Sequence, residues 1–524
     1  MLNLNICIRW SSLFLGGLLW SAPLAWAEPN TGDAPASASA GAGGQHKEAA
    51  KKEEAKALAG TIPDATHKPV LTKHRVTIAG QSVSYVAETG MLPLLKPDGT
   101  VRASIFYVAY MKEGEGRVER RPVTFCFNGG PGAASVWLHL GALGPRRVKL
   151  DENDPAQPAP LGLVDNPFSI LHVTDLVFID PVGTGFSQPG KENKAAQFFG
   201  QSPDIEAVGE FVQLWTTRHE RWLSPKYVCG ESYGVFRAAG LANHLHSRYG
   251  MSLSGLIFVS GILDLEMPED VNCQVFLPGY TAVAHFHKRL PPDLQADLPK
   301  ALAEARVFMR TEYASALFEG GSITARQRAR VVAELARLTG LPARLVEDCD
   351  LRVESAVFRK ELLHDQGLVV GRFDARITGR DANTAARYPG FDPSFSAVDG
   401  AFSSAMNAYV RGELKFTDDL PYWILNDVGP WKFETPRAVM REFADEMKAN
   451  PHLRVLVLSG QCDLACPLDY IRYNIDHLRL DPAYRGNISY ALYAAGHMMY
   501  VNLPDLQKMQ KDLEQFIRPS KEAK

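Results

Sequence analysis

Short apolar runs recur along the chain, and each ends in a glycine-rich turn that leads into a helical stretch. They occupy residues 123–127, 176–179, 227–229, 256–259 and 455–458. Runs of this length are typical of strands buried on both faces, and their alternation with helices is typical of a parallel sheet. The pattern therefore predicts an α/β fold with a mainly parallel central sheet.

Two blocks depart from this rhythm. Residues 75–78, 82–89 and 102–111 alternate between apolar and polar positions, which predicts a small antiparallel sheet over residues 72–111. From residue 266 to residue 410 the chain is largely helical, as in residues 294–313 and 324–338. We interpret residues 266–410 as a mostly helical insertion that caps the sheet domain.

The first 27 residues have the layout of a secretory signal. Arg9 precedes an apolar run over residues 10–19, and Ala25-Trp-Ala27 follows as a small-x-small cleavage pattern. The run is shorter than the roughly 20 residues of a membrane span, although an uncleaved anchor remains the alternative. We expect an exported protein, periplasmic or extracellular, with no stable membrane insertion after the signal is cleaved.

Residues 28–66 are rich in Ala, Gly, Lys and Glu, and they predict a disordered tether because they can bury too little apolar surface to offset the ordering entropy. The expected division is therefore signal 1–27, tether 28–66, one domain formed by 67–265 and 411–524, and the insertion 266–410.

The overall composition is that of a globular protein. Of 524 residues 46% are hydrophobic and 22% are charged, and 56 Lys and Arg oppose 59 Asp and Glu. A net charge of −3 gives no positive field for phosphates, so no nucleic-acid partner is expected. Seven cysteines are too few for a disulfide scaffold, and no Cys and His set has zinc spacing. We therefore predict neither a metal nor a cofactor.

Candidate chemistry begins at Gly230-Glu-Ser232-Tyr-Gly234, a G-x-S-x-G pentad between a strand-like run and a helical stretch at residues 235–249. In this setting a serine sits at the tip of a sharp turn with its hydroxyl exposed above the sheet. Small flanking residues are needed because the backbone turns too tightly for side chains. Ser232 is the predicted nucleophile.

A serine nucleophile needs a base, and the base needs an orienting carboxylate, in the chain order Ser, acid, His. Asp463 and His497 each follow a strand-like run, and they are the predicted acid and base. His477 falls in a predicted helix and is interpreted as a surface side chain. Asp264 is the competing acid, although it comes early in the sheet order.

An oxyanion hole requires backbone N–H groups aimed at the developing alkoxide. Asn128-Gly-Gly-Pro-Gly132 ends a strand-like run about a hundred residues before the serine, and its glycines favour close backbone approach to a ligand rather than a plain turn.

Taken in order, five motifs resemble those of the serine carboxypeptidase family. They are Asn128-Gly-Gly-Pro-Gly132, Asp180-Pro-Val-Gly-Thr-Gly-Phe-Ser187, Gly230-Glu-Ser-Tyr-Gly234, Gly460-Gln-Cys-Asp463 and Ala495-Gly-His497. The similarity extends from about residue 70 to about residue 510, and the chain resembles a bacterial-type exported member. The resemblance implies an α/β-hydrolase fold with a mainly parallel sheet and a helical cap.

The resemblance also implies roles for individual residues. It implies a Ser232–Asp463–His497 triad and an oxyanion hole made by the N–H groups of Gly130 and Tyr233. Asn128 and Glu231 match the residues with which the family binds the free carboxylate of a peptide C-terminus. Such a Glu must be protonated to donate to a carboxylate, which implies a preference for acidic pH.

Two positions depart from the family pattern. Cys126 stands where the family has a tryptophan, and Ala142 stands where the family has a second Glu that hydrogen-bonds the first. The pH dependence of carboxylate binding therefore does not follow from the resemblance.

The cysteines leave several pairings open. Cys462 and Cys466 flank Asp463 as a strained pair or as two thiols, and Cys466 matches a family cysteine near the substrate pocket. Cys273 and Cys349 both lie in the insertion, where a disulfide bond between them would cross-link it.

The resulting hypothesis is a serine carboxypeptidase that acts on peptides or proteins with a free C-terminus through an acyl-enzyme. A serine esterase or acyltransferase on the same scaffold is the alternative. A third reading is an inactive binding protein, which the intact set of catalytic residues disfavours.

Overall fold

The computed structural model describes residues 68–518 except 115, 117, 152–156, 160, 192 and 435–437. The predicted signal and tether lie outside these residues. Within them, a ten-stranded sheet runs through the molecule in the order β1-β2-β3-β7-β4-β9-β10-β13-β14, with β8 paired to β3. Its strands are β1 (Val70–Ile78), β2 (Gln81–Leu95), β3 (Val101–Lys112), β4 (Val123–Phe127), β7 (Asp175–Ile179), β8 (Gln188–Pro189), β9 (Lys226–Glu231), β10 (Gly255–Val259), β13 (Arg454–Gly460) and β14 (Ile488–Tyr493).

The sheet is parallel from β7 to β14 and antiparallel from β1 to β3. The predicted α/β fold with a mainly parallel sheet is thus confirmed. The antiparallel block over residues 72–111 also forms. It is not a separate small sheet, however, because β3 pairs with β7 and joins the central sheet, with Tyr107 opposite Ile179.

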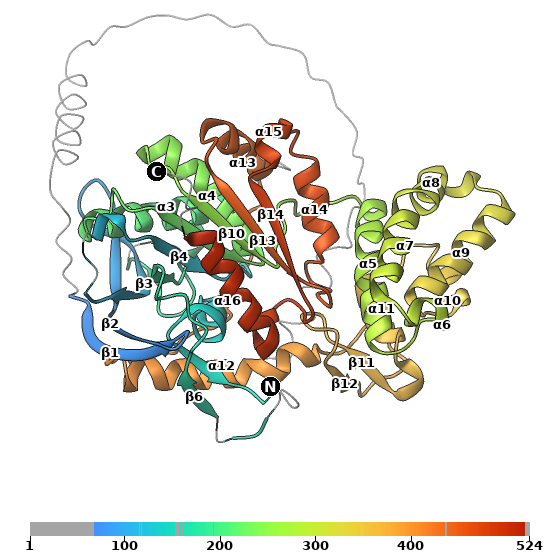
Figure 1. The fold of residues 1–524 in the computed structure, drawn as a ribbon, viewed down its shortest axis with the longest axis horizontal. Coiled ribbons are helices and arrows are strands. Elements are labelled where there is room, and N and C mark those ends of the chain that lie inside the picture. Colours follow the sequence, from blue (N-terminus) through green and yellow to red (C-terminus); the bar gives the residue numbers. More distant parts are fainter. Residues whose placement is uncertain are drawn as a thin grey trace, which may run out of the picture.

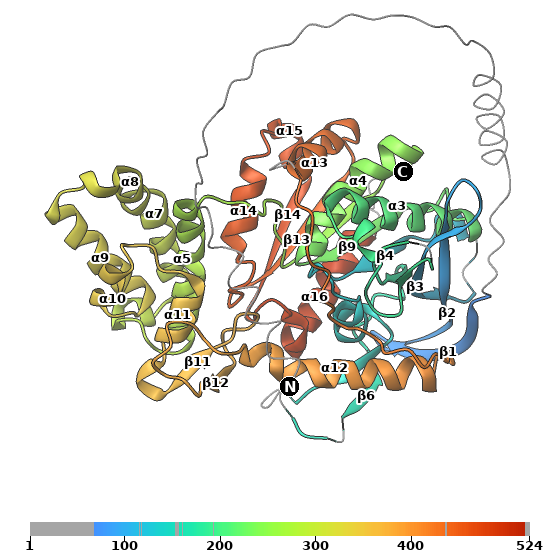
Figure 2. The same ribbon diagram turned by 180° about the vertical axis from the view of Figure 1, so that it is seen from behind.

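Helices cover both faces of the sheet, and each face has its own core (Figures 1 and 2). Strand β7 shows why its run is wholly apolar: Leu176 and Phe178 enter one core, whereas Val177 and Ile179 enter the other. One core packs against α3 (Gln201–Arg218), α4 (Tyr233–Tyr249) and α13 (Ala438–Ala449); the other packs against η2 (Leu138–Leu143), α12 (Pro393–Gly412) and α16 (Leu503–Ile517).

The insertion forms a helical lobe beside the sheet, from α5 (Glu269–Phe286) to α11 (Ser355–Glu361), at the right of Figure 1. It has a separate core, which also includes Cys462, Leu464 and Tyr470 of the sheet domain. Helix α12 falls within the predicted insertion but runs beneath the sheet domain and joins its core (Figure 1). The lobe also contains α6 (Pro292–Gln295), α7 (Leu298–Arg310), α8 (Glu312–Glu319), η4 (Gly320–Ser322), α9 (Ala325–Thr339), α10 (Ala343–Asp348), η5 (His364–Gln366), β11 (Leu368–Val370) and β12 (Thr378–Arg380).

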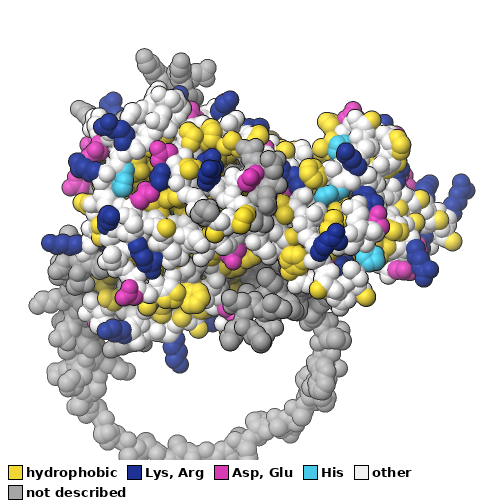
Figure 3. Space-filling model, turned by 90° about the horizontal axis from the view of Figure 1, so that it is seen from below, with side chains coloured by type: hydrophobic (Ala, Val, Ile, Leu, Met, Phe, Trp, Pro, Cys, Tyr) yellow, Lys and Arg dark blue, Asp and Glu magenta, His cyan; other side chains and the backbone are white. Residues whose placement is uncertain are grey.

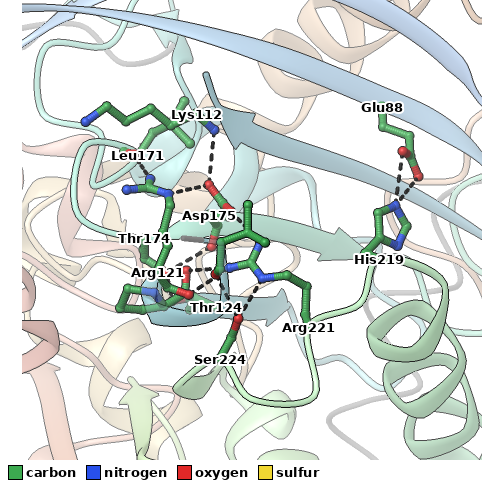
Figure 4. A network of polar contacts seen from close by, with 12 residues as sticks. Glu88, Lys112, Arg121, Thr124, Leu171, Thr174, Asp175, His219, Arg221 and Ser224 are labelled. Carbon is green, nitrogen blue, oxygen red and sulfur yellow. Dashed lines mark hydrogen bonds and ion pairs between the residues drawn. The ribbon is translucent and has the colours of Figure 1, made fainter. Parts of the chain in front are cut away.

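A buried ionic network fixes the amino ends of β4 and β7, opposite the strand ends that carry the predicted site (Figure 4). Asp175 accepts hydrogen bonds from Arg121 Nε at 2.7 Å and from Arg221 at 2.6 Å. Both arginines are almost completely buried. Because a buried charge is costly without partners, this network favours one alignment of the strands.

The surface mixes charges of both signs, and Lys and Arg side chains are scattered rather than gathered on the face shown in Figure 3. Within the described ranges, none of the helices combines the length and apolar character required to cross a bilayer.

The remaining elements are η1 (Val118–Arg120), β5 (Arg146–Lys149), β6 (Gly162–Asp165), η3 (Ala195–Gln197), α14 (Leu468–Asp476), α15 (Pro482–Arg485) and η6 (Met499–Val501).

Candidate active site

Ser232 occupies the sharp turn between β9 and α4. Its backbone has φ 60° and ψ −127°, a strained conformation for a residue with a side chain. The turn is held by two hydrogen bonds, from Ser232 N to Val259 O at 2.9 Å and from Val235 N to Ser232 O at 3.0 Å. The strand–turn–helix setting expected for the pentad is present.

The glycines around Ser232 are required by close backbone approach. A Cβ at Gly230 would lie 2.1 Å from Gly234 O, and a Cβ at Gly129 would lie 2.4 Å from Tyr233 N. The glycine-rich loop after β4 therefore packs directly on the serine turn. Because Tyr233 begins α4, its N–H has no carbonyl partner within the helix and remains available to a ligand.

Asp463 and His497 are hydrogen-bonded to each other, from His497 Nδ1 to Asp463 Oδ2 at 2.8 Å. The other carboxylate oxygen, Oδ1, accepts the N–H groups of Ala465 at 2.7 Å and Cys466 at 2.9 Å. These amides fix the carboxylate so that Oδ2 faces the ring. Burial lowers the pKa of His497, but the Asp463 charge and hydrogen bond outweigh it and leave the pKa raised.

The alternative residues are placed elsewhere. The backbone carbonyl of Asp264 accepts the Tyr470 hydroxyl at 2.9 Å, and the His497 partner is Asp463. His477 is exposed at the end of α14 and stacks on Tyr473. Ser232 and His497 form no hydrogen bond among the described contacts, although such bonds often tighten only when substrate is bound.

The sequence did not predict a contact from the β11–β12 turn to His497, the proposed base. Phe373, in the turn between β11 and β12, accepts the His497 backbone N–H at 2.5 Å, and its ring lies 5.0 Å from the imidazole. A Cβ at Gly496 would lie 2.1 Å from Phe373 O, so the glycine allows this approach. The β11–β12 turn thereby fixes the backbone that carries His497.

Arg237 also supports the site and was not predicted. It is buried on α4, donates to Asn128 O at 2.7 Å, and pairs with Asp204 at 2.7 Å. Its guanidinium lies over the rings of Phe127 and Tyr233. One side chain thus ties the start of the glycine-rich loop to the helix that follows Ser232.

Glu231 and Asn128 are buried side by side, at 3% and 1% exposure. Burial raises the pKa of Glu231 to about 7, against the opposing effects of the His497 charge and a hydrogen bond from Tyr500. Tyr500 donates to Glu231 Oε2 at 2.7 Å. Asn128 Oδ1 accepts the Leu138 N–H, while Asn128 Nδ2 lies near Glu231 and Tyr500 without a well-formed hydrogen bond.

Asp180, from the second motif, supports the glycine-rich loop. It accepts Ser135 N at 2.8 Å and the Tyr422 hydroxyl at 2.7 Å, and burial raises its pKa to about 6. A Cβ at Gly185 would lie 1.9 Å from the carboxylate. This motif therefore has a supporting position beside the predicted site.

The six described cysteines are all free, so the structure contains neither the Cys462–Cys466 pair nor the Cys273–Cys349 pair. The buried Cys466 thiol lies close to the Ser232 side chain, and burial raises its pKa. In the part of the chain that the structure describes, no three His, Cys, Asp or Glu side chains converge to hold a metal ion.

Comparison with known proteins finds similarity to one family. The family model for serine carboxypeptidases matches residues 81–302. Serine carboxypeptidase-like 16 of Arabidopsis thaliana is 26% identical over 195 residues, which cover 36% of this chain and 42% of that protein. Serine carboxypeptidase-like 15 of the same plant is 32% identical over 131 residues, covering 25% of this chain and 28% of that protein. Residues 81–302 of this chain are thus similar to the serine carboxypeptidase family.

The fold matches a solved structure of a related kind. The crystal structure of Kex1(delta)p, a prohormone-processing carboxypeptidase from Saccharomyces cerevisiae, superposes with a TM-score of 0.51 at 16% identity, over 82% of this chain and 91% of that one. This likeness confirms the predicted α/β-hydrolase fold. The matched stretches span less than half of the length of these curated relatives.

Proposed function

We propose that this chain is a serine carboxypeptidase that releases C-terminal residues from peptides through an acyl-enzyme. Ser232 attacks the last peptide carbonyl, His497 accepts and returns the proton, and Asp463 orients and stabilises the imidazolium. The N–H groups of Gly130 and Tyr233 stabilise the oxyanion. Water then releases the acyl group.

The observation that carries the proposal is the pair of buried groups beside Ser232. Asn128 Nδ2 is a buried donor without a well-formed partner, which is costly unless a ligand completes its bonding. Glu231 next to it has a pKa of about 7 and is a neutral acid below that pH. An amide donor and a protonated carboxyl together suit a carboxylate ligand, which is what a free peptide C-terminus presents.

This pairing implies a preference for acidic pH. Above the pKa of Glu231 two carboxylates would face each other, and like charges in a buried site repel. Binding of free-acid peptides should therefore weaken as the pH rises through about 7. The reacting groups themselves, Ser232 and His497, impose no such requirement on the substrate's C-terminus.

The test compares one blocked dipeptide as its free acid, its C-terminal amide and its methyl ester, at pH 5 and pH 8. We expect kcat/KM at pH 5 to favour the free acid over the amide by about tenfold or more, since charge-assisted hydrogen bonds are involved. The preference should shrink at pH 8. Ser232→Ala serves as the inactive control, and full activity of that variant would refute the proposed nucleophile.

A serine esterase or acyltransferase is the second candidate. Ala142 is buried in η2 and offers no carboxyl group to Glu231, in contrast to the family pattern. Equal turnover of the ester and the free acid at both pH values would favour this candidate.

The proposed partners are peptides or proteins with a free C-terminus, encountered after export to the periplasm or the medium. The export proposal is supported by the signal pattern in residues 1–27. Finding the N-terminus of the purified exported protein near Glu28 would test it.

A further inference from the structure

The Glu231 carboxyl has a partner that the motifs do not indicate. Tyr500 lies in η6, three residues after His497, and its hydroxyl donates to Glu231 Oε2 at 2.7 Å. Both side chains are buried, at 2% exposure for Tyr500 and 3% for Glu231. A hydrogen bond between two desolvated groups fixes the orientation of both, because neither can exchange its partner for water.

The surroundings are shaped to admit the Tyr500 ring. A Cβ at Gly141, in η2, would lie 2.5 Å from Tyr500 Cε2, and Phe402 of α12 lies beside the same position. Only a residue without a side chain can therefore stand at position 141 while the ring keeps its place. The phenol is thus held beside Glu231 with η2 and α12 next to its ring.

The direction of the hydrogen bond decides which carboxyl oxygen serves a ligand. Tyr500 gives its proton to Oε2, so the acid proton of a neutral Glu231 belongs on Oε1. Asn128 Nδ2, near both groups, lacks a well-formed hydrogen bond. An Oε1–H donor and an Asn128 N–H donor can then meet the two oxygens of a substrate carboxylate.

We propose that Tyr500 is a positioning residue that orients Glu231 toward the C-terminal carboxylate of the substrate and sets the pH range over which Glu231 receives it. This inference rests on the proposed carboxypeptidase function. The same short segment then carries the base at His497 and the orienting group at Tyr500.

The pH dependence follows from the groups that face Glu231. Burial and the Asp463 charge raise its pKa, whereas the His497 charge, the hydrogen bond from Tyr500 and the nearby Asn128 amide lower it. The Cys466 thiol is also near, and it interacts with the Glu231 charge. Removing the Tyr500 hydroxyl removes a donor to the carboxylate, so Glu231 stays protonated to higher pH.

The experiment measures kcat and KM from pH 4 to pH 9 for a blocked dipeptide and its methyl ester, in wild type and Tyr500→Phe. We expect KM for the free acid to rise about three- to tenfold at acidic pH, because a net hydrogen bond is lost. The pH at which the KM for the free acid begins to rise should be higher in Tyr500→Phe than in wild type. The ester KM and both kcat values should stay within about twofold of wild type, since the triad is unchanged.

Tyr493→Phe is the matched control, because the Tyr493 hydroxyl donates to Asp512 rather than to the site. Gly141→Ala is the second variant, and its added methyl should displace the Tyr500 ring and reproduce the KM effect. Labelling of Ser232 by a fluorophosphonate reports in each variant that the fold and the triad are intact.

Two outcomes separate the inference from the proposed function. If wild type shows no preference for the free acid, the carboxypeptidase proposal fails, and the role of Tyr500 fails with it. If wild type shows the preference but Tyr500→Phe alters ester and free acid alike, or leaves the KM profile in place, only the role of Tyr500 is refuted.

Discussion

Glu231 should make the protein less stable at alkaline pH, and replacing it should reverse this effect. Glu231→Gln keeps the shape of the side chain and an oxygen that can accept the Tyr500 hydroxyl, but it cannot ionise. The wild-type carboxyl must either stay protonated or carry a charge in a site that is 3% exposed. The Gln side chain of the variant does not titrate. The difference in the free energy of unfolding between the variant and wild type should therefore depend on pH.

The magnitude follows from the pKa of the carboxyl. Folding raises the pKa of Glu231 from 4.5 to about 7, and burial is the largest cause. The folded state therefore binds more protons than the unfolded state between these values, and stability falls as the pH rises through that window. A change of this size is worth about 3 kcal/mol. Glu231→Gln should match wild type at pH 4 and exceed it by about 3 kcal/mol at pH 8.

Urea unfolding followed by tryptophan fluorescence, at pH 4 and pH 8, measures this difference. Glu119→Gln is the control, because Glu119 is exposed in η1 and its replacement should change stability little at either pH. An equal difference between wild type and Glu231→Gln at both pH values would refute the reasoning. So would a variant that is less stable than wild type at pH 8.

Three further substitutions test the supports of the site. Asp463→Asn should lower kcat by about four orders of magnitude with little change in KM, because the imidazole loses its orienting anion, and slower fluorophosphonate labelling of the serine would accompany it. Gly129→Ala should lower kcat by about a hundredfold or more, since the new methyl would lie 2.4 Å from Tyr233 N in the proposed oxyanion hole; an unchanged kcat would argue against that hole. Arg237→Met should destabilise the fold by about 3–5 kcal/mol in thermal or urea unfolding by leaving Asp204 buried without its partner. Adding Asp204→Leu should restore most of that loss, and no recovery would contradict the electrostatic cause.

The strands of the central sheet could be predicted because their sequence signal is local. A run such as β4 at Val123–Phe127 is apolar throughout, since both of its faces are buried. Pairing between distant strands leaves no such signal. Strand β3 pairs with β7 through residues that lie far apart in the sequence, such as Tyr107 and Ile179. For this reason the sequence did not predict that the antiparallel block would be continuous with the main sheet.

The candidate site likewise combines residues that the sequence predicts with supporting contacts that it does not predict. Ser232, Asp463 and His497 stand in glycine-rich turns after strands, where the position itself indicates the chemistry. The supporting contacts have no local signature: Tyr500 and Glu231 are 269 residues apart, and Phe373 reaches His497 from within the cap. A tyrosine in a short helical turn is indistinguishable in sequence from one that merely fills a core.

The hydrogen bond between the Phe373 carbonyl and the His497 amide makes the cap only partly interchangeable. Helices α6 to α10 lie away from this junction and could be exchanged for those of a similar protein. The turn between β11 and β12 could not be, because it holds the backbone of the proposed general base. A chimera that grafts a foreign lobe should therefore keep residues 371–377 of the recipient.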